Sequence, residues 1–454
     1  MIDLQAYQLA FQTMSSKIFE AEVNAEIHDT VVVYVDEKTR NGVEISKKSA
    51  LYVRASGEKT GYYYTEDLQE DAMHAIETAY ENSLYSENVG CEDMNREPKV
   101  VDFGEETAEQ DVDTLSDLAI RLLKTLKSHM EFPKEDITIW GALKAETFGQ
   151  QVANSHGFEA SCVKPLYILE VGACVTVDGQ VYGSGASLAA GNIKCFNLKQ
   201  AAQDISMKCR VQMNPVKSFV SGDYPVILGN SVVYYLFATG WQFFSGVKYL
   251  NGSSAFCGKL GEKISDNYLE ITDKVLENGS GFPIFCDCEG SVGVDASIIR
   301  KGVWNGLLHN RTSANRMGKE LTGNAGRRPL LSGTICTDIL VTPKNFCVEP
   351  GEHSLEEMKK HMGDGILITE SFDVFHTLDI ATGDFSIPCY GIQIENGEEK
   401  GGFNGLTMTG NFRDLLANIV EVGAETMLHP MIALDNYGIQ SCPIRLSHLY
   451  LSGE

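Results

Sequence analysis

The feature that most restricts this chain is a stretch, residues 224–256, that contains no His, Asp, Glu or Cys. No histidine occurs anywhere between His156 and His309. The most apolar run of the chain, residues 232–238, lies inside this stretch and is far shorter than the roughly 18 residues that a membrane span needs. The apolar run is therefore too short to span a membrane. Because the side chains that bind divalent metals are missing, this stretch also excludes a metal centre built from its own residues.

The bulk composition predicts a soluble, globular, cytoplasmic protein. The 454 residues are enough for two or three domains, and the hydrophobic content of 43% is ordinary for a chain with a substantial core. The formal net charge of −25 argues against direct binding of nucleic acid, although residues 300–328 are comparatively basic and are interpreted as solvated surface. The first residues do not resemble a signal peptide, and twelve scattered cysteines are typical of a reduced cytosolic protein.

The first half of the chain predicts an α/β arrangement. We expect an opening helix over residues 4–19, with Thr65 capping a second helix. Thr114 with Asp117 resembles a capping pair before a leucine-rich helix. Apolar residues at helical spacing predict a further helix from Leu198 to Cys209. The expected strands are residues 21–27, 31–35, 50–55, 137–145 and 166–177, and residues 87–110 are predicted to be a long loop.

The second half is richer in strands and turns. Asp178-Gly179, Asn278-Gly279 and Asn396-Gly397 are two-residue turn signals, because these residue types tolerate a positive φ. Ser354 with Glu357 predicts a capped helix that stops at Gly363, and Asn411 predicts a helix toward Gly423. Residues 441–452 predict a closing strand. We place the domain boundary at residues 214–222, which gives an N-terminal α/β domain (1–216) and a strand-rich C-terminal domain (217–454).

Several separated peptides form an ordered series along the chain. The peptides are Ser221-Gly222-Asp223-Tyr224-Pro225-Val226, Gly252-Ser253-Ser254-Ala255-Phe256, Ser313-Ala314-Asn315-Arg316-Met317-Gly318, Thr322-Gly323-Asn324-Ala325-Gly326, Gly365-Ile366-Leu367-Ile368-Thr369-Glu370, Thr382-Gly383-Asp384-Phe385-Ser386 and Thr409-Gly410-Asn411-Phe412. In this order and spacing they resemble the TldD/PmbA family, whose members are also called modulators of DNA gyrase. The resemblance is tightest after Lys217 and covers nearly the whole chain. It implies an α+β fold with two domains.

The resemblance also implies where catalysis would take place. The metal-bearing branch of the family has a His-Glu-x-x-x-His motif on a helix, in which two histidines hold zinc and the glutamate activates water. The matching region here, roughly residues 232–248, contains neither a good metal ligand nor a general base. The chain is therefore similar to the PmbA (TldE) branch, and the resemblance implies no catalytic residue and no metal ligand in this helix.

Other candidates for a metal or catalytic site are weaker. Cys286 and Cys288 lack the second pair that a structural zinc site needs. His353 and His361 bracket two glutamates, but we expect them to lie two turns apart on a solvated helix. His429 and Cys442 lie where the metal-bearing branch would supply a further ligand. No Gly-x-Ser-x-Gly elbow or phosphate-binding loop is present.

The glycine-rich peptides have two interpretations. They can be ordinary turns, or they can line a cleft in which an extended peptide adds as a strand, because glycines allow another backbone to approach closely. The candidate cleft residues are Gly323, Asn324, Gly383, Asp384, Gly410 and Asn411.

The resemblance predicts a subunit that lacks the zinc site and works with a TldD-like partner, which holds the zinc and cleaves unfolded peptides during peptide maturation and proteolysis. A homodimer is the other possible assembly. Two alternatives stay open. One is an active homodimeric metallopeptidase with a divergent metal site, involving His429, Cys442 or groups of the opposing chain. The other is a non-proteolytic regulator that binds gyrase or another protein.

Overall fold

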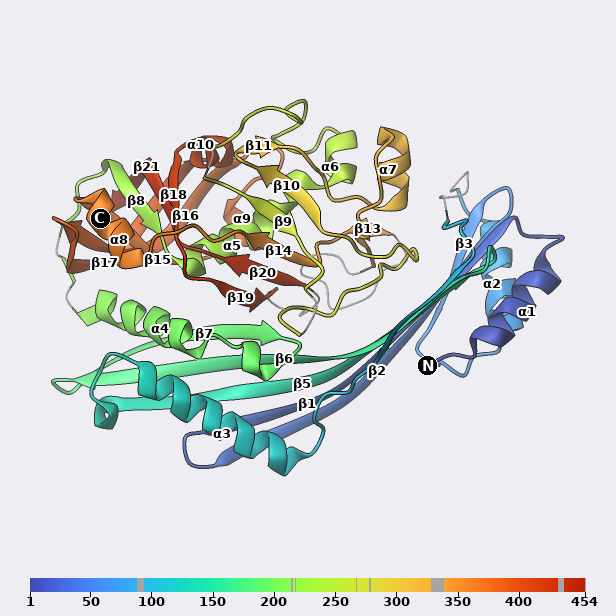
Figure 1. Cartoon of the computed structure of the whole chain (residues 1–454), viewed down its shortest axis with the longest axis horizontal. Coiled ribbons are helices and arrows are strands. Elements are labelled where there is room, and N and C mark those ends of the chain that lie inside the picture. Colours follow the sequence, from blue (N-terminus) through green and yellow to red (C-terminus); the bar gives the residue numbers. More distant parts are fainter. Residues whose placement is uncertain are drawn as a thin grey trace.

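The computed structural model describes residues 1–87, 94–213, 215–216, 218–266, 268–276, 279–327, 339–431 and 437–453. Figure 1 shows a small N-terminal lobe, a long curved sheet that runs from it beneath the rest of the molecule, and a C-terminal body above that sheet. Helices and strands are mixed throughout, and the predicted α+β class is confirmed.

The long sheet contains seven strands in the order β3-β2-β1-β5-β6-β4, with β7 also paired to β6. Among the pairings of the described residues in this sheet, β4–β6 is parallel and the others are antiparallel. The tight turn after β6 is the predicted one: Asp178 and Gly179 have φ values of 50° and 77°. The strands are β1 (Glu20–Asp36), β2 (Arg40–Ser56), β3 (Thr60–Thr65), β4 (Lys99–Glu105), β5 (Ile137–Asn154), β6 (Phe158–Val177) and β7 (Gln180–Ala190).

Helices cover this sheet at two places. At one end, α1 (Leu4–Met14) and α2 (Ala72–Ser83) bury an apolar stripe against β1 and β2 and form the N-terminal lobe. Near the other end, α3 (Val112–His129) and α4 (Leu198–Met213) pack beside each other on the sheet. Short 3₁₀ turns precede β5 and α4, at η1 (Lys134–Asp136) and η2 (Ile193–Cys195).

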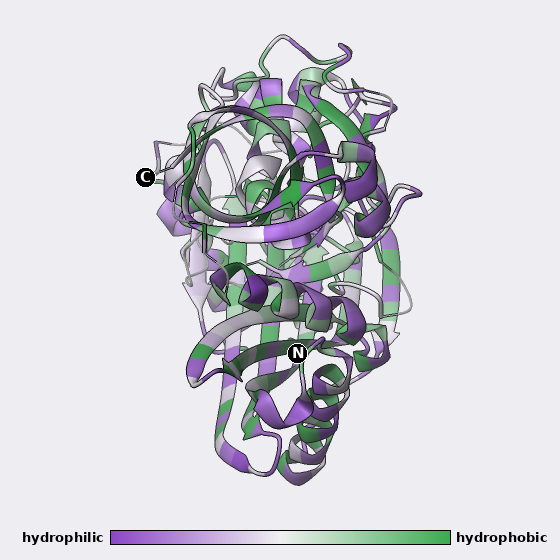
Figure 2. Ribbon diagram, turned by 90° about the vertical axis from the view of Figure 1, so that its left-hand side faces the viewer, coloured by the Kyte–Doolittle hydropathy of each residue, from purple (hydrophilic) through white to green (hydrophobic). Residues whose placement is uncertain are grey.

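The C-terminal body contains two six-stranded sheets and a short β12–β13 pair. One sheet has the order β11-β10-β9-β14-β20-β19. The other has the order β17-β16-β15-β8-β21-β18, and its additional β17–β21 pairing closes five strands into a barrel, the ring seen in Figure 2. The strands are β8 (Gly222–Leu228), β9 (Ile271–Asp273), β10 (Ala296–Arg300), β11 (Val303–Trp304), β12 (Ala325–Gly326), β13 (Leu340–Val341), β14 (Asn345–Val348), β15 (Gly365–Ser371), β16 (Asp384–Glu395), β17 (Glu398–Asn411), β18 (Ile419–Val422), β19 (Met427–Pro430), β20 (Gly438–Ser441) and β21 (Ile444–Gly453).

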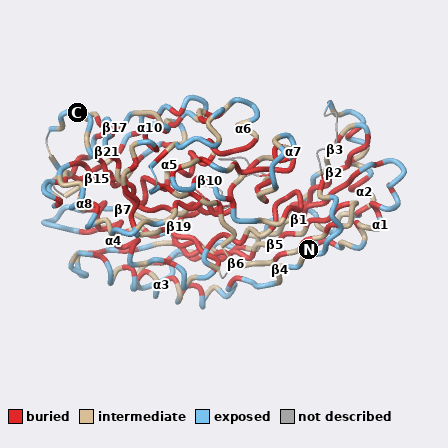
Figure 3. The backbone as a smooth tube through the Cα atoms, turned by 45° about the horizontal axis from the view of Figure 1, so that its top comes forward, coloured by how far each residue is buried: buried red, intermediate tan, exposed pale blue. Residues whose placement is uncertain are grey.

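The largest apolar core fills the space between these two sheets and surrounds α5 (Asn230–Gly240). Aromatic rings from distant parts of the sequence meet there, including Phe237, Phe346 and Phe412. Buried residues, red in Figure 3, run through this interior. The remaining helices of the body are η3 (Trp241–Phe244), α6 (Gly246–Leu250), α7 (Arg311–Met317), α8 (Leu355–Met362), α9 (Val374–Thr377) and α10 (Phe412–Ala417).

Several predicted boundaries were wrong. Residues 21–27 and 31–35 belong to one continuous strand, because both halves pair with β2 and β5. Asp71 rather than Thr65 caps α2, and Asp111 rather than Thr114 caps α3. Part of the expected loop at 87–110 is β4, which pairs with β6. The opening helix ends earlier than expected, at Met14.

Other predictions of local structure were confirmed. Ser354 and Glu357 form a reciprocal capping box at the start of α8. Asn396 and Gly397 form the turn between β16 and β17, with φ values of 53° and 78°. Asn411 caps α10, although that helix ends at Ala417 and the following residues form β18. Asn278, of the predicted Asn278-Gly279 turn, lies outside the described residues.

In the described part of the chain, no helix is both long and apolar enough to cross a membrane. Helix α4 ends at Met213 and β8 begins at Gly222, so the expected boundary at 214–222 falls between elements. The division at residue 216 stays a prediction, because α4 contacts strands of both halves.

Candidate functional site

Helix α5 occupies the position at which the resemblance places the metal-bearing helix. It begins after Gly229, ends at Gly240 and continues as the 3₁₀ turn η3. Its side chains are almost all buried, and Val232, Val233, Leu236 and Phe237 belong to the aromatic core between the two C-terminal sheets. This helix contributes apolar surface to the core, and none of its side chains is a strong ligand for a metal.

Tyr234 of α5 lies against His429 of β19. Their ring centroids are 4.3 Å apart and their planes differ by 19°, which is a stacked arrangement. Both nitrogens of His429 are engaged: Nδ1 lies 3.2 Å from the Ser187 carbonyl oxygen, and Nε2 lies 3.1 Å from Ser441 Oγ. Burial, with a contribution from Lys208, lowers the pKa of His429 to about 3. This imidazole is therefore neutral and is held by packing and hydrogen bonds.

Cys442, the other tail residue considered as a ligand, is also buried. Its Sγ lies 3.3 Å from the carbonyl oxygen of Val348. Burial raises the pKa of the Cys442 thiol, so the sulfur stays protonated. A thiol must lose its proton to bind a metal well, so this environment disfavours Cys442 as a ligand.

A cavity of about 700 Å³ with a mixed polar and apolar lining opens beside α5, between the long sheet and the C-terminal body. Ser231 and Tyr235 of α5 face it, together with Lys208 of α4 and Glu370 of β15. Backbone and side chains of β1, β5, β6 and β7 form the opposite wall. The size lies within the range of pockets that bind small molecules or short peptide segments.

Two sets of polar contacts hold the charged groups at this cavity. Lys208 Nζ lies 2.7 Å from Asp204 Oδ2, and Ser231 Oγ donates to the same oxygen at 3.0 Å. Ser184 Oγ donates to Glu370 Oε1 at 3.2 Å. Burial raises the pKa of Glu370, so its carboxyl group is more readily protonated than an exposed one. Burial alone would lower the pKa of Lys208, but the two carboxylates raise it.

These contacts were not predicted from the sequence. Asp204 and Lys208 are spaced i,i+4, which signals a pair on one helix face, and that face is buried. A charged pair within a predicted apolar helix was the only local clue. Glu370 is distant in sequence and reaches the cavity only because β15 pairs with β8, directly before α5.

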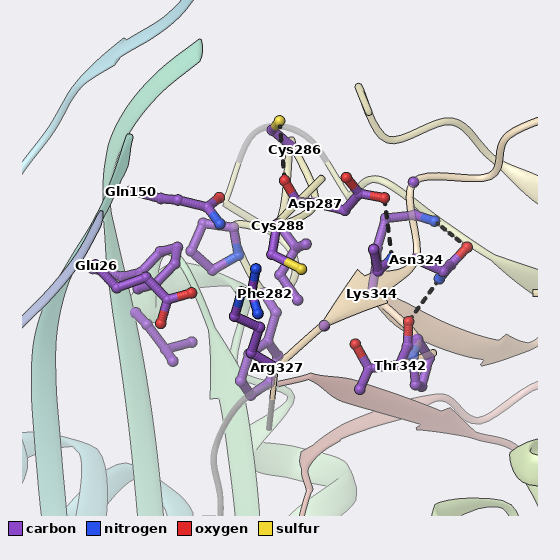
Figure 4. Close-up of a pocket in the computed structure, with 18 of the residues that line it drawn as sticks. Glu26, Gln150, Phe282, Cys286, Asp287, Cys288, Asn324, Arg327, Thr342 and Lys344 are labelled. Atoms are coloured by element: carbon purple, nitrogen blue, oxygen red, sulfur yellow. Dashed lines mark hydrogen bonds between the residues drawn. The ribbon is translucent and has the colours of Figure 1, made fainter. Parts of the chain in front are cut away.

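Gly323 and Asn324, two of the predicted cleft residues, line a second and smaller cavity of about 100 Å³ (Figure 4). Asn324 Nδ2 donates to Asp273 Oδ2 at 2.7 Å, and Lys344 Nζ lies 2.7 Å from the same oxygen. The facing wall comes from β1 and β5 and includes Glu26 and Gln150. This cavity therefore lies where the N-terminal sheet meets loops of the C-terminal body.

Asp287 and Glu289 are buried next to this cavity. Asp287 accepts backbone N–H groups of Glu289, Ser291 and Ala325 at 2.8–3.0 Å. Burial raises the pKa of Asp287 to about 6, and burial together with the Asp287 charge raises that of Glu289 to about 8. Cys286 and Cys288 are free and buried, as expected for structural thiols.

The other four predicted cleft residues lie together at the end of the β16–β17 hairpin. Asp384 pairs with Asn411, and Phe385 pairs with Gly410. Asn411 Nδ2 donates to Asp384 Oδ1 at 2.8 Å, and Gly383 has a φ of 83°. None of these four lines the cavity that contains Gly323 and Asn324. The structure thus divides the six candidates into two groups, and their role in peptide binding stays a prediction.

His353 and His361 do not lie two turns apart on one helix, as we expected. His353 precedes the Ser354 cap and is outside α8, whereas His361 lies in its last turn. Their rings are 4.7 Å apart, and both meet Glu421 of β18. Glu421 could not be associated with them from the sequence, because it lies 60 residues further along the chain.

Comparison with known proteins identifies the family. Residues 221–453 match the PmbA/TldA metallopeptidase C-terminal domain. A metalloprotease PmbA homolog of Haemophilus influenzae is 24% identical over 96% of this chain and 93% of its own length. The metalloprotease PmbA of Escherichia coli O157:H7 is 29% identical over 44% of this chain and 40% of its own length.

The fold is also found in solved structures. The crystal structure of TldE from Thermococcus kodakarensis superimposes with a TM-score of 0.79, covering 99% of this chain and 100% of that one at 20% identity. The family domain spans the entire barrel and α5, and the structural likeness extends over both halves. The chain therefore belongs to the TldD/PmbA metallopeptidase family.

Proposed function

We propose that this protein is the TldE/PmbA-like subunit of a TldD/PmbA-type peptidase and contributes no catalytic zinc site of its own. A TldD-like partner would supply the zinc and the general base. This chain would complete the chamber and hold unfolded peptide near the partner's metal. The expected assembly is a dimer with that partner, acting in peptide maturation and proteolysis.

One observation carries this proposal: helix α5 is built into the aromatic core and has no His, Asp, Glu or Cys. A catalytic zinc needs three protein ligands and an open coordination position. Tyr234 stacks on His429, and the two nitrogens of that histidine are engaged by the Ser187 carbonyl oxygen and Ser441 Oγ. Cys442 is held as a buried thiol. These contacts argue against a divergent zinc site made from His429 and Cys442.

The cavity beside α5 is the place at which we expect peptide to be held. Lys208 and Tyr235 can donate hydrogen bonds to peptide carbonyl groups, and Glu370 can accept one from a peptide N–H. Contacts to the backbone of a peptide depend little on its sequence, which suits a protein that receives many unfolded segments.

The test compares the isolated chain with the chain copurified with its TldD-like partner, using an unfolded fluorogenic peptide. We expect no hydrolysis by the isolated chain and hydrolysis by the complex. Replacing the partner's catalytic glutamate should abolish the activity. Robust hydrolysis by the isolated chain, retained through repeated purification, would show that the chain is itself an enzyme.

A substitution in the cavity distinguishes peptide binding from assembly of the two subunits. Lys208→Gln should raise the KM of the complex for the peptide while the two subunits still copurify. Lys400→Gln is a matched control, because Lys400 is exposed and pairs with Glu398 on β17. An equal change in KM for both variants would remove the cavity from the proposal. Capture of gyrase without any TldD-like subunit would favour the regulatory alternative instead.

A further inference from the structure

A cluster of two histidines and one glutamate lies on the surface of the C-terminal body, apart from α5. The Nδ1 atoms of His353 and His361 each lie 2.7 Å from Oε1 of Glu421. The two ring centroids are 4.7 Å apart with an interplanar angle of 88°. The three side chains offer ligand atoms that all lie within 4.8 Å of one another.

We propose that His353, His361 and Glu421 bind a late first-row divalent cation such as Zn²⁺. Two imidazole nitrogens and one carboxylate oxygen are a ligand set that zinc accepts and that calcium and magnesium, which prefer oxygen ligands, do not. This site is distinct from the family's helix, so the proposal goes beyond the proposed function and does not depend on it.

The spacing of the ligand atoms is close to what the ion requires. Bonds of about 2.0–2.1 Å at tetrahedral angles place neighbouring ligand atoms about 3.3 Å apart. The two separations between Glu421 Oε1 and the Nδ1 atoms are 2.7 Å, so each would lengthen by about 0.6 Å, and all three ligand atoms already lie within 4.8 Å of one another. The histidine side chains are 47% and 43% exposed, which leaves them room to make this adjustment.

The surrounding contacts orient the ligands from three elements. Arg445 Nε donates to Oε2 of Glu421 at 2.6 Å, which leaves Oε1 directed at the histidines. The backbone of His353 is fixed by a hydrogen bond from Ala424 N to its carbonyl oxygen at 2.8 Å. His361 is fixed by α8, whose start is held by the capping box. Such outer contacts commonly determine the orientation and affinity of metal ligands.

The exposed side of the cluster gives the ion access and leaves a coordination position for water. Glu421 itself is buried, with only 6% of its surface exposed. The site therefore has one buried carboxylate ligand and a side that is open to solvent. A bound ion would connect the segment before α8, the end of α8 and β18. These elements lie at the end of the body opposite the N-terminal lobe (Figure 1).

The experiment uses the untagged full-length chain, stripped with a chelator and titrated with Zn²⁺ by isothermal calorimetry, with bound metal counted by mass spectrometry. We expect one ion per chain. The His353→Ala/His361→Ala double variant should lose at least about tenfold in affinity, because it removes two direct ligands. Circular dichroism checks that this variant is folded.

A matched control is His376→Ala, which removes an exposed histidine that is paired with Asp373 elsewhere on the surface. It should bind zinc like the unmodified chain. X-ray absorption of the loaded protein should show nitrogen and oxygen neighbours with imidazole scattering. No binding by the unmodified chain, equal binding by the double variant, or one ion shared by two chains would each overturn the proposal.

The same variant separates this inference from the proposed function. If the double variant loses zinc and the isolated chain is inactive with or without the ion, both proposals stand. If zinc remains in the double variant and the isolated chain hydrolyses peptide, the zinc is bound at a different site of this chain, and the proposed function is contradicted. If zinc never binds, only the surface site fails.

Discussion

The ion pair between Lys344 and Asp273 offers the sharpest test of which contacts stabilise the segments around the second cavity. Both side chains are essentially inaccessible, at 1% and 0% exposure, and Nζ lies 2.7 Å from Oδ2. Lys344 Nζ also donates to the carbonyl oxygen of Thr322 at 2.9 Å and to Asn324 Oδ1 at 3.2 Å. This one ammonium group therefore links β9 to the loop that carries the predicted cleft residues.

Lys344→Met removes the cation and leaves a buried carboxylate. Breaking a buried pair in this way costs about 3–5 kcal/mol. Asp273 keeps two donors, the backbone N–H of residue 344 at 2.8 Å and Asn324 Nδ2 at 2.7 Å, so we expect the lower end, about 3 kcal/mol. For a cooperative unit of the size of the C-terminal half, this corresponds to a fall in Tm of about 6–12 °C.

The assay is calorimetric unfolding of three variants under one set of conditions. Lys274→Met is the matched control, because the neighbouring Lys274 pairs with Glu349 at 2.7 Å but remains 28% exposed. Its loss should be about 1 kcal/mol or less. The double variant Lys344→Met/Asp273→Asn should recover more than half of the loss, because no buried charge remains unpaired. If Lys344→Met costs no more than Lys274→Met, the buried pair does not hold this region.

Two further outcomes concern other buried groups. The pKa of Glu289 in the folded state is raised to about 8. The folded state therefore holds a proton that the unfolded state releases above about pH 4.3. The stability that this proton contributes is present at low pH and is lost as the pH rises toward 8. Glu289→Gln should therefore raise Tm relative to the unmodified chain more at pH 8 than at pH 5, and an equal shift at both values would contradict the assignment. Tyr234→Ala should cost about 3 kcal/mol in urea unfolding because it removes a buried ring and its contact with His429, whereas Tyr234→Phe should cost only about 1 kcal/mol for the lost hydrogen bond to Pro430.

Local signals in the sequence predicted local structure well. The Asp178-Gly179 turn, the Ser354–Glu357 capping box and the Asn411 cap each depend on a few neighbouring residues and were found where expected. Helix starts were missed where two acceptable caps stood close together, as with Asp111 and Thr114. There the choice depends on where the helix meets the sheet, which the local sequence does not contain.

The sites depended on contacts between distant residues. Glu370 joins Lys208 only through the pairing of β15 with β8. Glu421 joins His353 and His361 because β18 and the segment before α8 run side by side, with an isolated bridge between His353 and Gly423. The helical interpretation of the two histidines failed for the same reason, since His353 is positioned by that bridge and not by α8.

The packing of α5 explains why a metal site could not easily be built on this helix. A metal-binding motif grafted onto this helix would have to replace buried residues such as Val232, Val233 or Phe237, which fill the aromatic core. An imidazole at such a position would lose apolar contacts and would bury polar nitrogens that lack partners, and each term costs about 1–3 kcal/mol. The tyrosine stacked on His429 would also have to move before that histidine could turn toward an ion. Gain of a zinc site here therefore requires several simultaneous changes in the core, which supports our proposal that a partner chain supplies the zinc.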